Sequence, residues 1–329
     1  MRILKILGIL LVILVVVAAG AATYVSTSFP DVGEAPDIKI DRTPERIARG
    51  EYLANNLMGC MDCHAERDFS KLTGPVKPGT EGAGGDFWDY KFGFPGKMYS
   101  PNITPTNLGS WTDGEIYRAI TAGVNKDGDA LFPIMPYPHF GKMPREEIYS
   151  VIAYLRTLPE RPGEYPEREL DFPLNFIVNT MPQKSEEKFS FPDVTNKVEY
   201  GKYLMNAAAC ADCHTPQIKG EYQMDQFLAG GMQFELPDGG ISTAANITPH
   251  PETGIGKWTE QAFVNRFKQY DESTFVPTAV NKGEFNSIMP WTYYSRLGEE
   301  ELSAIYTYLQ SLEAIDNKVE KFAMKKEAE

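Results

Sequence analysis

Two pentapeptides in this 329-residue chain combine cysteine and histidine at the same spacing. Cys60–His64 and Cys210–His214 both read Cys-x-x-Cys-His, and together they use all four cysteines. This spacing is the attachment pattern of c-type haem. Two residues between the thiols let one turn of chain reach both vinyl groups, and the adjacent histidine then points at the iron. The sequence therefore predicts two covalently bound haem c groups, held through Cys60, Cys63, Cys210 and Cys213, with iron ligands His64 and His214.

Three other uses of paired cysteines agree less well with this pattern. Disulfides would leave the histidine after each pair without a role. A zinc site made of four thiolates would do the same. A thioredoxin-like redox pair is usually single and lies near a βαβ unit, and no such pattern is present here. Covalent dihaem binding is favoured over all three.

The landmarks around the two haem motifs recur in the same order along the chain. The matched segments are Arg49–Leu53 with Tyr200–Leu204, Pro101–Pro105 with Ala245–Pro249, Gly109–Thr112 with Gly256–Thr259, Ile134–Pro136 with Ile288–Pro290, and Ala153–Leu158 with Thr307–Leu312. Such an internal repeat indicates a tandem duplication of one haem-binding unit. We therefore expect the two units to fold alike.

A haem iron with one histidine ligand needs a second axial ligand, or it stays open for chemistry. The thioether of methionine is a common second ligand where the iron only exchanges electrons. Met135 and Met289 occupy equivalent positions in the two units, and a proline follows each of them. We therefore predict that they are the second axial ligands of the two irons.

Other candidate ligands lack a counterpart in the repeat. His139 and Met143 lie soon after Met135, but the second unit has Tyr293 and Leu297 at their positions. His250 follows its Asn-Ile-Thr-Pro segment, and the first unit has a threonine there. Both spare histidines are interpreted as surface residues or as neighbours of the site rather than as ligands.

The first residues carry positive charge, and a long apolar run follows. Arg2 and Lys5 precede an uncharged stretch that begins at Ile6 and ends at Asp31. A secretory signal cleaved near Ala19–Ala21 is one interpretation. We favour the other, an uncleaved anchor, because the run exceeds the ~7–15 residues of a signal core and approaches the ~20 that span a bilayer. The positive-inside rule then leaves the haem units in the periplasm, on a single-pass protein of the bacterial inner membrane; a cleaved leader would release a periplasmic protein.

Helix signals surround each haem motif. Thr43 and Pro44 suit a helix start, and the helix that follows should run over residues 45–57. Thr112 and Thr259 are predicted N-caps of later helices. The last helix of each unit shows helical periodicity, with inward positions at Ile148, Ile152, Leu155, Leu302, Ile305 and Leu309.

Two recurring glycines lie inside the first helix of each unit. Glycine in a helix interior costs about 1 kcal/mol relative to alanine, so Gly50 and Gly201 need a compensating role. We expect each to permit a close crossing with the last helix of its unit, near Tyr154 and Tyr308. Trp111 either donates its indole N–H to a haem propionate or fills the core, and the same two roles are open to its counterpart in the second unit.

The chain as a whole is expected to be mainly α-helical, with long loops. The predicted division is a membrane helix (1–28), a tether (29–42), a first haem domain (43–158), a proline-rich connector (159–197), a second haem domain (198–314) and a charged tail (315–329). The tail is expected to be a solvated helix end or disordered.

At this level of detail a known family can be recognised. Each unit resembles a class I cytochrome c domain, over residues 44–158 and 198–312. The run Asn246–Pro249, Pro251–Gly256 and Trp258–Thr259, then Met289–Pro290 and Leu309, resembles the cytochrome c subunits of membrane-bound periplasmic alcohol, gluconate and aldehyde dehydrogenases. Those subunits usually carry three haems, and this chain carries two haem motifs. The resemblance implies electron transfer from a dehydrogenase towards quinone or a terminal oxidase.

Charge and ligand chemistry narrow the function further. A net charge of −13 argues against nucleic acid as a partner, because phosphate binding requires a basic face. Two six-coordinate irons would make the chain an electron carrier rather than an enzyme, with a dehydrogenase, a quinol-oxidising complex or a terminal oxidase as redox partner. The alternative is a dihaem enzyme, a peroxidase or a thiosulfate-dehydrogenase-like protein, with one open or exchangeable haem position. A thiosulfate-dehydrogenase-like protein would need a cysteine ligand at its catalytic haem, and no cysteine remains once the four thioethers form.

Overall fold

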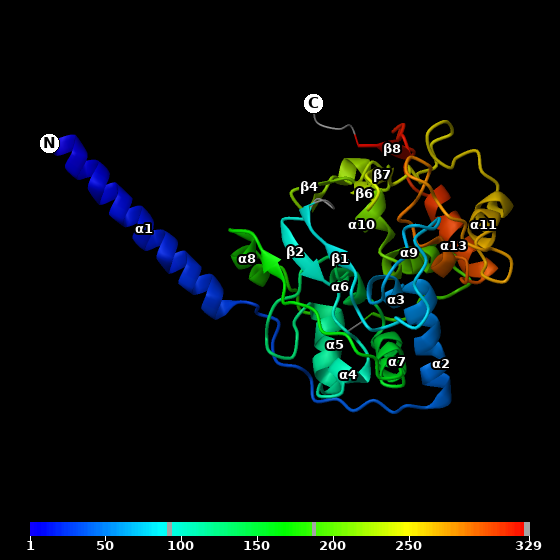
Figure 1. Cartoon of the computed structure of the whole chain (residues 1–329), viewed down its shortest axis with the longest axis horizontal. Helices are drawn as coiled ribbons and strands as arrows, with labels where there is room; N and C mark the ends of the chain where they lie inside the picture. Colours follow the sequence, from blue (N-terminus) through cyan, green and yellow to red (C-terminus); the bar gives the residue numbers. More distant parts are fainter. Residues whose placement is uncertain (91–93, 186–188, 326–329) are drawn as a thin grey trace.

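The computed structural model describes residues 1–90, 94–185 and 189–325. A long N-terminal helix, α1 (Arg2–Ser28), projects from a body of short helices, long loops and small antiparallel sheets (Figure 1). Within the described residues, α1 is the one helix long and apolar enough to cross a membrane, and none of it is buried. The chain therefore has the N-terminal apolar helix that its sequence predicts.

Helices frame both haem motifs. In the first half they are α2 (Pro44–Tyr52), the π-helix η1 (Leu53–Leu57), α3 (Cys60–Cys63), α4 (Pro105–Leu108), α5 (Asp113–Ala122), α6 (Tyr137–Phe140) and α7 (Arg145–Leu155). The connecting segment contributes α8 (Leu174–Ile177) and the 3-10 turn η3 (Val178–Thr180). The second half has α9 (Lys197–Ala207), α10 (Cys210–His214), η4 (Met224–Gln226), α11 (Glu260–Lys268), α12 (Trp291–Tyr294) and α13 (Glu299–Gln310). The predicted helices are thus present in both halves.

The first helix of each half crosses the last one, with glycine at the crossing. α2 packs on α7, and α9 packs on α13. A Cβ added at Gly50 would overlap the backbone carbonyl of Ser150 and lie 2.9 Å from Tyr154 Cβ. A Cβ added at Gly201 would lie 2.6 Å from the carbonyl carbon of Ala304 and 2.8 Å from Tyr308 Cβ. The close crossings expected from the two glycines are confirmed.

Helix starts also agree with their predicted caps. Thr43 Oγ1 accepts a hydrogen bond from the Arg46 amide, with Pro44 in the first turn. Thr112 and Glu115 form a reciprocal capping box at the start of α5. Thr259 Oγ1 accepts from the Ala262 amide at the start of α11. Each cap satisfies an amide that has no partner within the helix.

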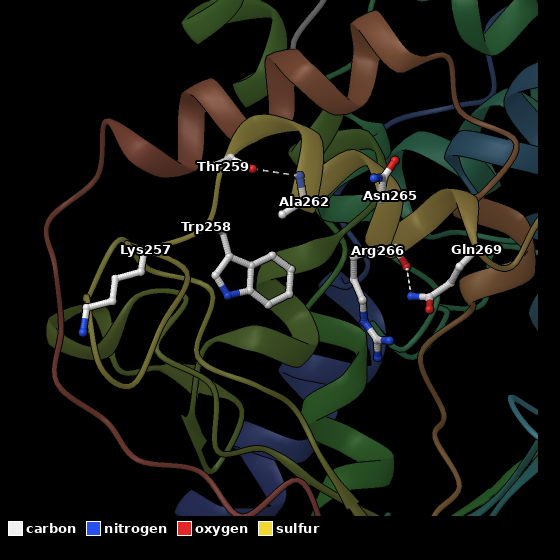
Figure 2. A pocket seen from close by; sticks show the side chains of 7 residues that line it. All are labelled: Lys257, Trp258, Thr259, Ala262, Asn265, Arg266 and Gln269. Atoms are coloured by element: carbon white, nitrogen blue, oxygen red, sulfur yellow. Dashed lines mark hydrogen bonds between the residues drawn. The ribbon is translucent and has the colours of Figure 1, made fainter.

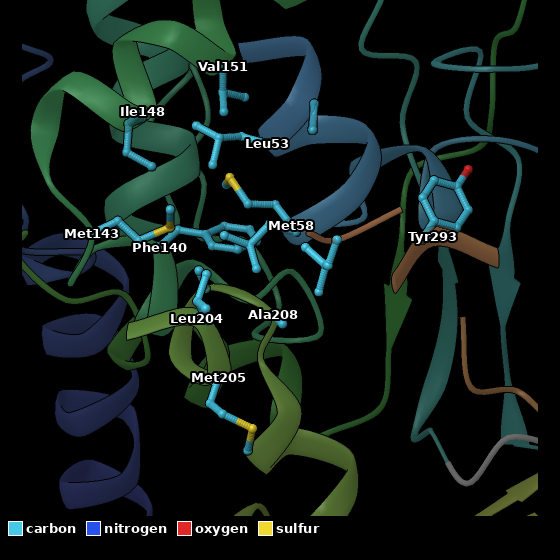
Figure 3. Close-up of a cluster of buried hydrophobic side chains, with 14 of the residues drawn as sticks. Leu53, Met58, Phe140, Met143, Ile148, Val151, Leu204, Met205, Ala208 and Tyr293 are labelled. Carbon is cyan, nitrogen blue, oxygen red and sulfur yellow. The ribbon is translucent and has the colours of Figure 1, made fainter. Parts of the chain in front are cut away.

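The two halves share one apolar core. The buried cluster draws side chains from both halves (Figure 3), and Met58, Phe140 and Met143 lie in it together with Leu204 and Tyr293. The inward positions predicted for the last helices, Ile148, Ile152, Leu155, Leu302, Ile305 and Leu309, are all buried. The two halves therefore pack against each other rather than standing apart on a flexible link.

A one-residue difference between the repeats is absorbed by the π-helix. The segment from Gly50 to Cys60 is one residue longer than that from Gly201 to Cys210. In the first half α2 continues into η1 (Leu53–Leu57), whose wider turn accommodates the extra residue. In the second half α9 is α-helical throughout. In both halves the haem motif then forms a short helix, α3 in the first and α10 in the second.

Three segments outside the haem units are more ordered than the sequence suggests. The tether contacts α5, since Ile40 is buried and its amide donates to Asp113 Oδ2 over 3.0 Å. β3 (Glu169–Leu170), in the connector, pairs with β2 (Gly96–Tyr99), which also pairs with β1 (Phe87–Trp88). The tail forms β8 (Phe322–Met324), which pairs with β7 (Gly240–Thr243) beside β6 (Gln233–Glu235), so the expected helix end or disorder is wrong there. The remaining strands are β4 (Gln217–Ile218) and β5 (Glu221–Tyr222).

The residue before each haem-motif helix has a left-handed backbone. Gly59 (φ 60°) precedes α3, and Ala209 (φ 49°) precedes α10. This conformation costs an L-residue roughly 1–2 kcal/mol, whereas glycine adopts it freely but loses more entropy on folding. A Cβ at Gly59 would meet nothing closer than Asp62 Cβ at 4.0 Å, so its penalty is conformational only.

We predict opposite effects for the two exchanges at these positions. Ala209→Gly should raise the free energy of unfolding by up to about 1 kcal/mol, and Gly59→Ala should lower it by about 1 kcal/mol. Denaturant titration of the haem-loaded proteins in detergent measures both changes. Destabilisation by Ala209→Gly would show that the left-handed turn carries no strain.

Candidate functional site

The histidine of each haem motif is held by a backbone carbonyl. His64 Nδ1 lies 2.8 Å from the Pro101 carbonyl oxygen, and His214 Nδ1 lies 2.7 Å from that of Ala245. Because a carbonyl can only accept, Nδ1 carries the proton in both rings and Nε2 keeps its lone pair. Metal-ligating histidines show this arrangement, in which the partner fixes both tautomer and ring orientation. Both rings are therefore prepared to bind iron through Nε2.

The repeated Asn-Ile-Thr-Pro segment positions these carbonyls. Asn102 Oδ1 accepts hydrogen bonds from the amide and the hydroxyl of Thr104, at 2.8 and 2.6 Å. Asn246 Oδ1 accepts the same pair from Thr248, at 2.9 and 2.7 Å. Each asparagine thus closes a local turn right after the carbonyl that holds the histidine. The repeat is visible in the sequence, but no side chain in it marks the carbonyls of Pro101 and Ala245 as the partners of the two histidines.

The electrostatic surroundings keep both histidines neutral. Burial lowers the pKa of His64, and the hydrogen bond to Pro101 opposes this only in part. Burial likewise lowers the pKa of His214, against the bond to Ala245. Neutral imidazole is the form that binds a metal. The donor chemistry of both motifs therefore fits haem iron.

None of the four motif cysteines, all of which lie in the described part of the chain, is paired in a disulfide. Burial raises the pKa of Cys60 and of Cys210 to about 12, so these thiols are protonated at neutral pH. No group of three or more His, Cys, Asp or Glu side chains in the described ranges is arranged to bind a metal ion.

Met135 and Met289 lie in matching turns. The Met135 carbonyl accepts from the Tyr137 amide at 2.7 Å, and the Met289 carbonyl accepts from the Trp291 amide at 2.8 Å. The intervening prolines have the backbone angles of an inverse γ-turn. Both methionines are half-buried, and Met135 packs on the apolar core. Their role as axial ligands stays a prediction, now with the same local geometry at both positions.

The indole N–H of Trp111 is a buried donor without a partner among the residues that the structure describes. Within the described residues, Trp111 Nε1 has no hydrogen-bond partner although it is buried. An unsatisfied buried N–H costs about 1–3 kcal/mol, and a carboxylate of a bound porphyrin would relieve that cost. Trp111 also packs on the core, so both roles considered for it are compatible with the structure.

Two side chains of the first half, Arg67 and His139, contact the second half near its candidate site. Arg67 pairs with Asp62 inside the first motif at 3.0 Å and donates to the carbonyl of Ile288, next to Met289, at 3.3 Å. Asn286 Oδ1 accepts from the Thr73 amide at 2.9 Å. The loop after the first haem motif therefore supports the segment that leads to the second methionine.

His139, also in the first half, contacts the second haem motif. Its Nε2 lies 2.6 Å from Asp212 Oδ1, inside the second haem motif, and its Nδ1 lies 3.1 Å from Asn206 Oδ1. Burial lowers the pKa of His139, but the hydrogen bond and charge of Asp212 together raise it above its usual value. His139 is therefore a neighbour of the second site, which is one of the two roles expected for it.

Two glutamates on the last helices make a reciprocal contact between the halves. Tyr52, on α2, donates to Glu301, on α13, and Tyr203, on α9, donates to Glu147, on α7, at 3.1 Å. Tyr52 and Tyr203 are equivalent in the repeat, and so are the two glutamates. Arg49 adds an ion pair to Glu147. The same tyrosine–glutamate contact thus joins the two halves at two equivalent places.

A surface cavity of about 500 Å³ lies along α11 in the second half (Figure 2). Trp258 lines it between Lys257 and Arg266 (Figure 2), and the guanidinium carbon of Arg266 lies over the Trp291 ring, 4.5 Å from the ring centre. None of the predicted haem-binding residues lines this cavity. It therefore does not belong to the candidate site.

Residues 198–313 match the cytochrome c family. The second haem motif lies in a cytochrome c domain. That family supports covalent attachment of haem c to this part of the chain. The cytochrome c domain contains α9, α10, α11, α12 and α13, with Cys210, Cys213, His214 and Met289 among its residues.

Curated relatives of the chain are cytochrome subunits and a diheme cytochrome. The fructose dehydrogenase cytochrome subunit of Gluconobacter japonicus is 29% identical over 82% of this chain and 53% of that protein. The alcohol dehydrogenase (quinone) cytochrome c subunit of Gluconacetobacter polyoxogenes is 28% identical over 81% and 56%. A diheme cytochrome c-type protein of Cereibacter sphaeroides is 27% identical over 78% and 83%. The resemblance to dehydrogenase cytochrome c subunits is confirmed, and the chain spans little more than half the length of the two subunits.

Proposed function

We propose that this chain is a membrane-anchored dihaem cytochrome c that carries electrons between a dehydrogenase or a quinol-oxidising complex and a terminal acceptor. The proposal assigns it two tandem cytochrome c domains, residues 43–158 and 198–314, on the periplasmic side of a bacterial inner membrane. α1 is the proposed anchor. The chain itself catalyses no reaction of an organic substrate.

One observation carries the proposal: both histidines are prepared for iron in the same way. His64 and His214 each direct Nδ1 to a carbonyl at the start of the same repeated segment. A chance Cys-x-x-Cys-His match would not bring with it a matching carbonyl from a segment far along the chain. We therefore assign a haem to each motif, including the one outside residues 198–313.

Each side chain then has a defined task. Cys60, Cys63, Cys210 and Cys213 would hold the two porphyrins. His64 with Met135, and His214 with Met289, would ligate the two irons. When bound, haem c supplies one-electron oxidation and reduction. The protein positions the two groups and excludes other iron ligands.

The partner is proposed from the relatives and from charge. Relatives named as dehydrogenase cytochrome subunits favour a dehydrogenase as electron donor. A net charge of −13 suits docking to a basic surface. The acceptor is expected to be a quinone or a terminal oxidase.

Carbon monoxide binding tests the closed iron positions. We predict that the reduced, full-length protein binds no carbon monoxide, because a methionine occupies the sixth position of both irons. The visible spectrum of the reduced protein, recorded with and without the gas, measures this directly. Binding at one haem would contradict the carrier and favour a dihaem enzyme with one exchangeable position.

A further inference from the structure

We infer that the segment from Phe172 to the end of α8 lies on the membrane surface and forms a second lipid contact beside α1. This inference rests on the proposed role of α1 as a membrane anchor. It names an interaction surface in the connector, a region that takes no part in haem binding.

Large apolar side chains of this segment point away from the body. Phe172 is 80% exposed and Ile177 is 46% exposed. Phe176 contacts Phe172 edge-on, with ring centres 6.1 Å apart. Val178, directly after α8, is in contrast buried at 1% exposure and ties the segment to the body. An exposed aromatic and aliphatic cluster on a fixed base is a surface that binds an apolar partner.

The position of α8 along α1 identifies that partner. α8 and η3 both contact α1. Figure 1 shows α8 on the side of the body that faces α1. Residues 2–21 of α1 are all exposed, whereas Ala22 and Val25 are partly covered. The contact therefore falls on the last turns of the helix.

The length of α1 sets this contact at the edge of the bilayer. A span of the hydrocarbon core takes about 20 residues, and α1 has 27. If the apolar run that starts at Ile6 crosses the core, the partly covered turns at Ala22 and Val25 lie near the outer boundary. Amphipathic segments insert their apolar side chains at this depth, and aromatic residues are enriched there.

The connection between α1 and the body favours lipid over another protein. The segment after α1 is held against α5 by the buried Ile40 and by the hydrogen bond from its amide to Asp113. The body is therefore kept close to the point where α1 leaves the membrane. Phe172 and Ile177 then face the lipid surface that α1 itself enters.

Photo-crosslinking of the full-length, haem-loaded protein tests this inference. The photoreactive residue p-benzoylphenylalanine replaces Phe172, Ile177, Leu11 or Val276, one at a time. Each protein is reconstituted into vesicles of phosphatidylethanolamine and phosphatidylglycerol and irradiated, and adducts are identified by mass spectrometry. Leu11 reports on the anchor. Val276 is a matched control, equally exposed at 80% but in the second half.

We expect lipid adducts at positions 172, 177 and 11, and none at position 276. Lipid adducts at position 11 alone would overturn the inference and leave the anchor standing. Loss of lipid adducts at all positions would refute the anchor and the inference together. A protein adduct at 172 or 177 would assign the cluster to a protein partner, and equal lipid adducts at 276 would show unspecific contact; either result overturns the inference.

Discussion

Gly201→Ala should abolish the native packing of α9 on α13 and should therefore strongly reduce the yield of haem-loaded protein. The added Cβ would lie 2.6 Å from the carbonyl carbon of Ala304 and 2.8 Å from Tyr308 Cβ. Backbone atoms cannot rotate away as a side chain can, so the two helices would have to separate. Overpacking typically costs 1–3 kcal/mol, and we expect at least about 3 kcal/mol here. Haem-stained yield and thermal unfolding in detergent measure the loss.

The sign of this effect makes the test specific. In an exposed helix interior, alanine in place of glycine stabilises by about 1 kcal/mol, which is opposite to our expectation. Lys202→Ala is the matched control, because Lys202 is exposed on the same helix. Gly50→Ala should repeat the result in the first half, with Glu51→Ala as its control. Equal melting of Gly201→Ala and Lys202→Ala would refute the close crossing.

Met289→Leu should open the second iron to external ligands. Leucine conserves volume, and such exchanges usually cost less than about 1.5 kcal/mol, so the fold should survive. Without the thioether, the reduced protein should bind one equivalent of carbon monoxide, and the potential of that haem should fall because methionine ligation raises it. Met135→Leu should do the same at the first iron. Spectra under carbon monoxide and a redox titration measure both effects.

Met143→Leu provides the control for these exchanges. Met143 is buried at 4% exposure in the same region as Met135, and the second half has Leu297 at its position. The variant should therefore bind no carbon monoxide and keep both potentials. If Met143→Leu opened the first iron instead of Met135→Leu, our ligand assignment for that half would be wrong.

Features with local chemical causes could be predicted from the sequence. The haem motif needs its cysteines and histidine within one turn of chain, so its spacing alone identifies it. The caps at Thr112 and Thr259 depend on residues three positions away. Gly50 and Gly201 were informative because each makes its helix less stable unless another segment passes close by.

Features that depend on distant backbone atoms could not be predicted in this way. Any residue has a carbonyl, so the partners of His64 and His214 have no distinctive side chain. Pairing of β8 with β7 joins a charged tail to a loop far along the chain. The contact of His139 with Asp212 required knowledge of how the halves meet. In the repeat His139 stands opposite a tyrosine, which argued only against iron ligation.

The contact made twice, Tyr52 with Glu301 and Tyr203 with Glu147, has the form of a two-fold homodimer interface. In a true homodimer every substitution changes both sites at once. Here one chain carries both halves, so each side can vary alone, and assembly does not depend on protein concentration. The motif aspartates already differ in this respect: Asp62 faces Arg67, a permanent charge, and Asp212 faces His139, a titratable one. With a haem at each motif, as proposed, the two irons would hold different affinities for an electron, which is the condition for directional flow through a single polypeptide.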